Sequence, residues 1–526
     1  MNKLNKTEKI KTTCRSCHGG CGVILTLENN KVVKIQPDQD SPLNQGRICP
    51  KGLAALEILY HPDRLRYPMK RLGKRGEGKW ERISWDEAYY ILTKNINLLE
   101  EKYGIESIAV MHGTGRHHHR HIRRFANALG TPNCVSSGHC ICFGPRVLAC
   151  QFTYGTFPVV DYYGKTKPAC ILVWGANPAV SGADCELQFH IKDAVRAGTK
   201  LIVIDPIPNE LTKKAALWLR IRPGSDGALA LGILNILISE ELYDKQFVEK
   251  WTYGFAELKE RCKKYNPKLV SEITWISEEQ IIAAARMIAK VKPLSLEWGC
   301  AIEHTPNSFQ TVRAIGMIPA LTGNFDIPGG FIEGMDALPG IDILRGSLSD
   351  EQRDKCIGAK AFPFLAGKAN MNPSSHPPLT LEAMITGKPY PIKGALIFGN
   401  NSLLSLPNSK NVYKALLNLD FISCMDLFMT PTAALADLVL PAASWMELDE
   451  VYGGPYRAEH VVLCQKKVIR TGECKADEEV FLELCKRLGR NYQAETVYDI
   501  FDEQLKGIGE KYPAYKDLDF EKLKKK

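Results

Sequence analysis

Four cysteines near the start of the chain place the strongest constraint on its fold. Cys14, Cys17 and Cys21 follow a C-x2-C-x3-C pattern, and Cys49 comes after 27 further residues. Residues 22–36 contain two β-rich runs around an Asn-Asn pair, which favours a hairpin turn. Because a hairpin reverses the chain, the segment that ends at Cys49 can return to the first three thiols.

This spacing predicts an iron–sulfur cluster. Three thiolates within eight residues and a distant fourth suit the corners of a 4Fe–4S cubane, which takes four cysteine ligands. Structural zinc is the alternative, but zinc sites more often use two C-x2-C pairs. We therefore expect Cys14, Cys17, Cys21 and Cys49 to be metal ligands.

Composition and length limit the class of protein. A chain of 526 residues exceeds one hydrophobic core and predicts several domains. The longest mainly apolar stretch, Gly227–Ile238, is too short to cross a bilayer, so no direct membrane span is expected. The first residues contain no export signal, and seventeen cysteines without one favour reduced thiols and a cytoplasmic protein.

The positive charge does not favour nucleic-acid binding. The net charge of +9 is divided among Lys70–Lys79, Arg116–Arg124 and Lys522–Lys526, whereas nucleic-acid proteins more often carry one continuous basic stripe. We expect no nucleic-acid partner. A bound polyphosphate cofactor would use the same charge.

Alternating strands and helices predict an α/β fold. Residues 169–174 and 200–204 are β-rich runs on either side of a helical pattern at 184–197, which together form a βαβ unit and imply a parallel sheet. A capping box that begins at Ser84 predicts a helix toward Tyr103.

Two similar turns follow predicted strands. Gly175-Ala176-Asn177-Pro178 follows the run at 169–174, and Gly399-Asn400 follows the run at 394–398. Glycine lets backbone amides approach a diphosphate at the carboxyl end of a strand. The repeat therefore predicts two equivalent dinucleotide crevices, although neither turn matches G-x-G-x-x-G.

Three further segments are candidates for the same cavity. Asp205 ends the strand at 200–204 and suits ribose or base recognition, with a plain strand-end turn as the alternative. The glycine-rich loops 223–227 and 322–330 can line the cavity or serve as ordinary connections.

These motifs, with Cys49-Pro50-Lys51-Gly52 and the stretch Ala436–Ser444, resemble the dimethyl-sulfoxide-reductase family of molybdopterin enzymes from Cys14 to about Gly489. The resemblance implies bis-molybdopterin guanine dinucleotide, molybdenum or tungsten, and a 4Fe–4S cluster. Lys51 would then bridge cluster and pterin as a catalytic and cofactor-binding residue.

The resemblance also assigns the dinucleotide contacts. One dinucleotide would be held by Trp174, Gly175, Asn177, Pro178, Asp205, Pro206, Gly224 and Asp226, and the other by Gly399 and Asn400. The family's metal ligand lies before x-Gly-Pro, which selects Cys142, with Cys140 as the competitor and a free buried cysteine as the alternative. A soft thiolate suits a sulfur-ligated molybdenum or tungsten.

Departures from the family bear on the substrate. Phe143 stands where formate dehydrogenases have histidine, and residues 329–334 contain no arginine, which disfavours formate. Acetylene hydratase has aspartate after the second cluster cysteine, whereas this chain has His18, a candidate catalytic residue.

The main hypothesis is two-electron redox chemistry, with a sulfur oxyanion or polysulfide as one substrate class. Non-redox hydration and a cluster-bearing electron-transfer or scaffold subunit without pterin are the alternatives.

The predicted fold class is multidomain α/β, with a small N-terminal β-rich Fe–S domain and two Rossmann-like domains with parallel sheets. The domains are residues 1–62 (joined by about 440–475), 63–134 with about 345–440, 135–344, and a helical C-terminal segment at 476–526. Family members continue into a further β-rich domain, so we expect a split or truncated gene product. Expected partners are a small-molecule substrate, an electron-transfer Fe–S subunit and a chain that supplies the further domain.

Overall fold

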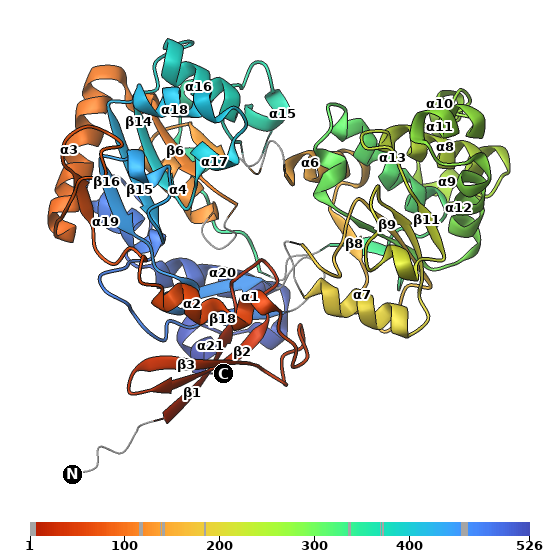
Figure 1. Ribbon diagram of the computed structural model, residues 1–526, viewed down its shortest axis with the longest axis horizontal. Helices are drawn as coiled ribbons and strands as arrows, with labels where there is room; N and C mark the ends of the chain where they lie inside the picture. Colours follow the sequence, from red (N-terminus) through yellow and green to blue (C-terminus); the bar gives the residue numbers. More distant parts are fainter. Residues whose placement is uncertain are drawn as a thin grey trace.

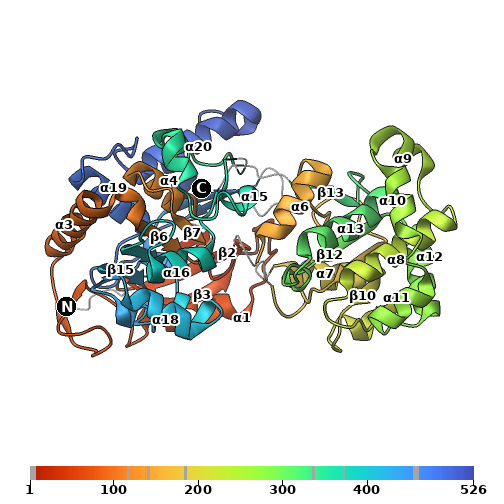
Figure 2. The same ribbon diagram turned by 90° about the horizontal axis from the view of Figure 1, so that it is seen from above.

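The computed structural model has a small N-terminal sheet below two larger α/β bodies that lie side by side (Figures 1 and 2). This arrangement confirms the multidomain α/β class. The structure describes residues 7–114, 119–136, 138, 142–182, 186–334, 338–368, 370, 373–453 and 461–525. Within these ranges no helix combines the length and the apolar character needed to cross a membrane.

The N-terminal sheet is an antiparallel meander. It consists of β1 (Thr7–Thr13), β2 (Gly22–Glu28) and β3 (Lys31–Pro37), in that order. Asn29 and Asn30 have φ angles of 50° and 64°, the left-handed conformation that a two-residue hairpin turn requires. The predicted hairpin is therefore confirmed. Two short helices follow, α1 (Pro50–Leu53) and α2 (Ala55–Tyr60).

The first α/β body, on the right of Figure 1, contains a parallel sheet in the order β11-β10-β9-β12. These strands are β9 (Cys170–Trp174), β10 (Lys200–Ile204), β11 (Leu217–Leu219) and β12 (Leu294–Trp298). The first two fulfil the predicted βαβ unit, with the parallel register that a crossover helix allows.

Helices cover both faces of this sheet. Leu172 and Trp174 of β9 pack toward α8 and α13, whereas Ile171 and Val173 pack toward α7. The helices of this body are α6 (Gly144–Tyr154), α7 (Leu187–Arg196), α8 (Asp226–Ser239), α9 (Lys245–Trp251), α10 (Phe255–Cys262), α11 (Pro267–Thr274), α12 (Glu278–Lys290) and α13 (Ser308–Leu321). The apolar run at 227–238 is the buried helix α8, as its length suggested.

The second α/β body, on the left of Figure 1, contains a seven-stranded sheet in the order β5-β4-β16-β15-β14-β6-β7. Its strands are β4 (Met69–Arg71), β5 (Trp80–Arg82), β6 (Ile108–His112), β7 (Cys134–Ser136), β14 (Gly394–Phe398), β15 (Phe421–Asp426) and β16 (Leu438–Pro441). The five strands from β16 to β7 are parallel, and β4 and β5 pair antiparallel at one edge.

This sheet is also covered on both faces. Leu396 and Phe398 pack with α3 (Trp85–Tyr103), α4 (His119–Leu129) and α19 (Asp477–Arg487). Ala395 and Ile397 pack toward α16 (Pro377–Thr386) and α18 (Ser409–Leu417). The hydroxyl of Ser84 accepts a hydrogen bond from the N–H of Glu87, so α3 begins where the sequence predicted.

The remaining strands form two-stranded pairs, and the remaining α-helices have four to fifteen residues. They are the strand pairs β8 (Pro158–Val160) with β13 (Phe331–Glu333) and β17 (Glu450–Gly453) with β18 (Val462–Gln465), and the helices α14 (Asp350–Asp354), α15 (Pro363–Ala366), α17 (Ser402–Ser405), α20 (Val497–Lys511) and α21 (Phe520–Lys525).

Late segments of the chain complete the N-terminal part. The hydroxyl of Thr13 donates to the carbonyl oxygen of Cys464 at 3.1 Å, and the N–H of Lys466 donates to the hydroxyl of Thr12 at 2.8 Å. Phe501 and Phe520 of the C-terminal helices pack with Val451. These contacts support the domain boundaries given above, which we retain as a proposal.

A fully buried ion pair joins the end of the N-terminal segment to the late segment. Arg64 and Glu447 pair with no side-chain exposure on either residue. Arg64 also donates to the carbonyl oxygens of Leu59 and Ala442, while Glu447 accepts from the backbone N–H of Thr471 at 2.7 Å. Both charges are therefore compensated away from water.

We expect the substitution Glu447→Gln to lower the free energy of unfolding by about 3 kcal/mol or more, because it leaves the Arg64 guanidinium buried without its counter-charge. Urea denaturation followed by tryptophan fluorescence measures this loss. The matched control is Glu241→Gln, which breaks a solvent-exposed pair with Lys245 and should leave the midpoint unchanged. Equal midpoints for the two variants would contradict the prediction.

Candidate cofactor and metal site

The four predicted cluster ligands lie together behind the N-terminal sheet. The N–H of Cys14 donates to the carbonyl oxygen of Cys21 at 2.8 Å, and the N–H of Gly19 donates to the Cys17 sulfur at 3.4 Å. Cys49 caps the N-terminus of α1. A Cβ on Gly52, in the first turn of α1, would lie 3.3 Å from the Cys14 sulfur.

Burial and mutual repulsion characterise these thiols. Burial raises the pKa of Cys14 to about 11, with further contributions from Cys17 and Cys49. Burial also raises the pKa of Cys21, to which Glu186 and the other three thiols add. Within the described ranges no three His, Cys, Asp or Glu side chains surround a point as the ligands of a single ion would.

Helix α7 of the first α/β body packs against this cysteine segment. The carboxylate of Glu186, at the start of α7, lies so near Gly19 that a Cβ there would collide with it. One turn later the His190 Nε2 lies 3.0 Å from the carbonyl oxygen of Leu43, and Asp193 pairs with Arg47. One helix therefore fixes the distance between the cysteines and the sheet.

Each α/β sheet ends in a pair of glycines on adjacent parallel strands. Gly175 follows β9 and Gly299 follows β12, while Gly399 follows β14 and Gly113 follows β6. A Cβ on Gly299 would collide with the carbonyl oxygen of Gly175, and a Cβ on Gly113 with that of Gly399. Gly175 and Gly399 have φ angles of 57° and 51°. The predicted repeat is thus a repeat of backbone geometry that only glycine permits.

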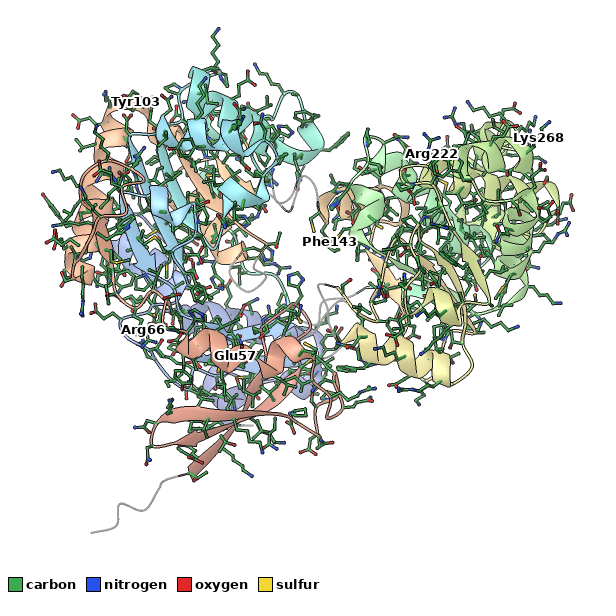
Figure 3. The ribbon with its side chains drawn as sticks, in the orientation of Figure 1. Glu57, Arg66, Tyr103, Phe143, Arg222 and Lys268 are labelled. Atoms are coloured by element: carbon green, nitrogen blue, oxygen red, sulfur yellow. The ribbon has the colours of Figure 1, made fainter. Side chains whose placement is uncertain are left out.

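A cavity of about 700 Å³ lies between the two bodies. Residues from three separate parts of the chain line it: His18 and Tyr452 from the N-terminal part; His112, Gly113, His119, Arg120 and Arg123 from the second body; and Cys142, Phe143, Gly175, Asn177, Pro178, Gly299 and Cys300 from the first body. Phe143 lies at the edge of the first body that faces the other one (Figure 3).

Cys142 contacts a second thiol in this cavity. Its sulfur lies 3.7 Å from the sulfur of Cys300, which follows Gly299 at the end of β12. The nearby pair of Arg146 and Glu303 joins the two segments, with Nε 3.1 Å from Oε1. Burial, and to a lesser degree the Cys300 thiol, raises the pKa of Glu303 to about 7, although Arg146 opposes the shift.

The residues predicted to contact the first dinucleotide fall into two groups. Gly175, Asn177 and Pro178 line the cavity with Cys142. Trp174 is buried, and its indole N–H donates to Asp226 at 2.8 Å, so these two side chains hold the strand end in place. The two oxygens of Asp205 accept from the N–H of Ile207 and the amide of Asn209, each at 3.0 Å, in a turn that includes Pro206.

Other predicted residues lie elsewhere. Gly224 and the loop at 322–330 line a separate cavity of about 1790 Å³ within the first body. Lys51, in α1, is exposed and is not among the lining residues of the Cys142 cavity. Gly399 is exposed, and Asn400 is buried and accepts from the Ser402 hydroxyl. Cys140 lies outside the described residues.

Sequence reasoning missed several residues of this site. Gly113 and Gly299 each follow a β-rich run, which was the available signal, but neither is followed by Asn. Asp426, the last residue of β15, comes directly after Met425, which pairs with Phe398; it is the counterpart of Asp205, which comes directly after Ile204, the partner of Trp174. Cys300 has no sequence neighbour that marks it as part of a metal site.

The buried amide of Asn177 tests the fit of a polar ligand. Its Oδ1 is buried and has no hydrogen-bond partner among the described residues, although the backbone carbonyl of Asn177 accepts from the N–H groups of Val180 and Ser181. A buried acceptor normally has a donor. With the open glycine turn beside it, this amide fits a ligand that carries N–H or O–H groups and a diphosphate.

Comparison with known proteins identifies the family. The molybdopterin oxidoreductase model matches residues 64–487, and the molybdopterin oxidoreductase Fe4S4 domain model matches residues 7–61. The chain belongs to the molybdopterin oxidoreductase family. It is therefore a molybdopterin-dependent enzyme, with a 4Fe–4S cluster near its N-terminus and a molybdopterin cofactor that holds molybdenum or tungsten. Two earlier alternatives are therefore not retained: structural zinc at the four cysteines, and a cluster-bearing electron-transfer or scaffold subunit without pterin.

Individual family members cover most of the chain. Acetylene hydratase from Syntrophotalea acetylenica is 34% identical over 91% of this chain and 69% of its own length. A probable oxidoreductase, YoaE, from Bacillus subtilis is 32% identical over 91% of this chain and 68% of its own length. The solved structure of acetylene hydratase from Pelobacter acetylenicus matches with a TM-score of 0.84 and 31% identity over 98% of this chain and 74% of that one.

His190, at the contact between α7 and the cysteine segment, gives a pH prediction. Burial lowers the pKa of His190 to about 4. The folded chain therefore keeps this imidazole neutral, and the stabilisation is present above pH 6.5 and is lost as the pH falls toward 4. We expect the wild-type chain to lose up to about 3 kcal/mol more unfolding free energy over this range than His190→Gln, which retains a donor for Leu43.

Urea midpoints at a series of pH values measure the effect. His61→Gln, which removes an exposed imidazole that does not act on His190, is the matched control that keeps the His190 imidazole and its pH dependence. Parallel pH profiles for the wild type and His190→Gln would mean that the imidazole is protonated in the folded chain.

Proposed function

We propose that Cys142 is the protein ligand of the molybdenum or tungsten and that the chain carries out two-electron redox chemistry on a small-molecule substrate. One observation carries this proposal: His18, directly after the cluster cysteine Cys17, lines the same cavity as Cys142 and the Gly175 turn. A proposed cluster ligand and a residue that lines the reaction cavity are thus adjacent in the chain.

The strand-end glycines support two dinucleotide sites. Gly175, Asn177, Pro178 and Asp205, with Trp174, Pro206, Gly224 and Asp226, would hold one molybdopterin guanine dinucleotide, and Gly399 and Asn400 would hold the other. The equivalent backbone geometry of the Gly175 and Gly399 turns supports this assignment. Close backbone approach lets N–H groups bind a diphosphate.

The metal, when bound, supplies the two-electron step, and the side chains of the chain position the substrate and move protons. Cys142 offers a soft thiolate. The imidazole of His18 faces the cavity and can give or take one proton at a ring nitrogen. Arg120 and Arg123 lie across the cavity and favour negative charge on the ligand.

Electrons then leave or enter through the cluster. We propose that Lys51, two residues after Cys49, lies between the cluster and the pterin and that an Fe–S partner subunit in the cytoplasm exchanges the electrons. The short sequence distance from Lys51 to a cluster ligand supports the route.

Non-redox hydration is the second candidate. The 34% identity to acetylene hydratase and the TM-score of 0.84 favour it. His18 would then be the proton-transfer group where that enzyme has aspartate. In this case the cluster would act through its charge and would not change its oxidation state during turnover.

The ligand assignment predicts that Cys142→Ala lowers turnover at least about 100-fold, because the metal loses its protein sulfur. The cluster absorbance and iron content should stay at wild-type values. Anaerobic purification followed by metal analysis and activity measurement checks both. Cys464→Ala, at a half-buried thiol outside the cavity, is the control. Full activity of the Cys142→Ala variant would show that Cys142 is not the ligand of the metal.

The two candidate reactions differ in their need for an electron carrier. We expect turnover of the wild-type chain to stop when the artificial electron donor or acceptor is omitted, and to scale with its concentration when it is present. Candidate substrates, including acetylene, are tested under both conditions by product analysis. Sustained product formation without any carrier would select hydration and overturn the redox proposal.

A further inference from the structure

Cys300, the cavity thiol that no sequence motif predicted, lies next to Cys142 and can react together with it. Cys142 and Cys300 are separated by 158 positions in the sequence, yet their sulfurs lie 3.7 Å apart, which is van der Waals contact for two thiols. Both side chains are partly exposed and line the same cavity. A small reagent that enters the cavity therefore meets two thiols side by side.

A buried clamp holds these two thiols in place. Arg146 lies four residues after Cys142, and Glu303 lies three residues after Cys300. The backbone N–H of Arg146 donates to Glu303 at 3.2 Å, the two side chains form an ion pair, and the Arg146 guanidinium also donates to the carbonyl oxygen of Trp298. The side chain of Glu303 is fully buried. The contact between the sulfurs is thus set by the packing around it.

We propose that Cys142 and Cys300 form a redox-active dithiol that closes to an intramolecular disulfide when the metal is absent and a small-molecule disulfide is present. A disulfide bond is about 2.05 Å long, so the sulfurs must approach by about 1.7 Å, which side-chain rotation at the two cysteines can supply.

The step is a two-stage exchange. One cysteine sulfur attacks a glutathione disulfide, forms a mixed disulfide and releases one glutathione thiol. The second cysteine then attacks the protein sulfur of that mixed disulfide and releases the other glutathione thiol. The two protein thiols lose two electrons and two protons, and the glutathione disulfide gains them.

The closed disulfide would keep the proposed ligand from the metal. This consequence for cofactor loading rests on the proposed role of Cys142, whereas formation of the disulfide rests only on the contact between the thiols. Reduction of the bond would then be required before molybdenum or tungsten is bound. The dithiol would protect an empty site from irreversible oxidation of its ligand.

The experiment uses the full chain, produced in a host without molybdopterin and purified anaerobically. The chain is treated with oxidised glutathione, free thiols are alkylated, and peptides are mapped by mass spectrometry. We expect a chain about 2 Da lighter, with a cross-link between the Cys142 and Cys300 peptides at least about tenfold more abundant than any other cross-link. Retained glutathione on Cys142, a cross-link through Cys140, or no reaction at Cys142 would overturn the proposal.

Two variants make the result specific. In Cys300→Ser the second stage cannot occur, so Cys142 should keep one glutathione. Cys464→Ser removes a half-buried thiol outside the cavity and should leave the cross-link unchanged. Wild-type cluster absorbance in each variant reports that the chain is folded. A cross-link that persists in Cys300→Ser would refute the pairing.

A parallel measurement separates this inference from the ligand assignment. In the chain loaded with cofactor, Cys142 should resist oxidised glutathione if it binds the metal. If the cross-link forms equally in loaded and unloaded chains, the dithiol stands and the role of Cys142 as ligand fails. If no cross-link forms in the unloaded chain while Cys142→Ala still loses the metal, the ligand stands and the dithiol fails.

Discussion

The site depends on backbones that touch where parallel strands end. Gly175 meets Gly299 in one sheet, and Gly399 meets Gly113 in the other. Any side chain at Gly113 or Gly299 would force neighbouring strands apart, because the obstructing atom is a carbonyl oxygen that cannot rotate away. Both sheets therefore present bare peptide groups at their carboxyl ends. The fold therefore offers the same kind of surface on each body. This arrangement suits a metal centre that is held between two similar cofactor molecules.

The second determinant is the helix that connects one of these surfaces to the cysteines. Helix α7 packs against one face of the sheet through Leu187 and Ile191 and against the cysteine segment through His190 and Asp193. A ten-residue helix does not bend easily over this length, so the cluster and the Gly175 turn keep a fixed separation.

Local signals in the sequence predicted the elements well. The strands at 200–204 and 394–398 have the predicted limits, because buried parallel strands are continuous apolar runs. The hairpin at 22–36 and the start of α3 followed from turn and cap residues. The roles given to the individual site residues stay predictions, because neither the geometry nor the relatives test them one by one.

What the sequence did not predict involves partners distant along the chain. The Arg64–Glu447 pair joins residues 383 positions apart, and the Cys142–Cys300 contact spans 158 positions. No pattern within a window of the sequence marks such pairs. The loop at 223–227, which could have lined the dinucleotide cavity or served as an ordinary connection, lines another cavity within the first body.

The contacts between Thr12 or Thr13 and residues near 465 set an order of events during synthesis. The four predicted cluster cysteines are synthesised some 400 residues before the residues near 465 that contact β1. At 5–20 residues per second, this leaves them unprotected for roughly tens of seconds. An inorganic cluster inserted in that interval would stand open to oxygen and water. The N-terminal sheet therefore reaches its full set of contacts only after residues near 465 have been synthesised.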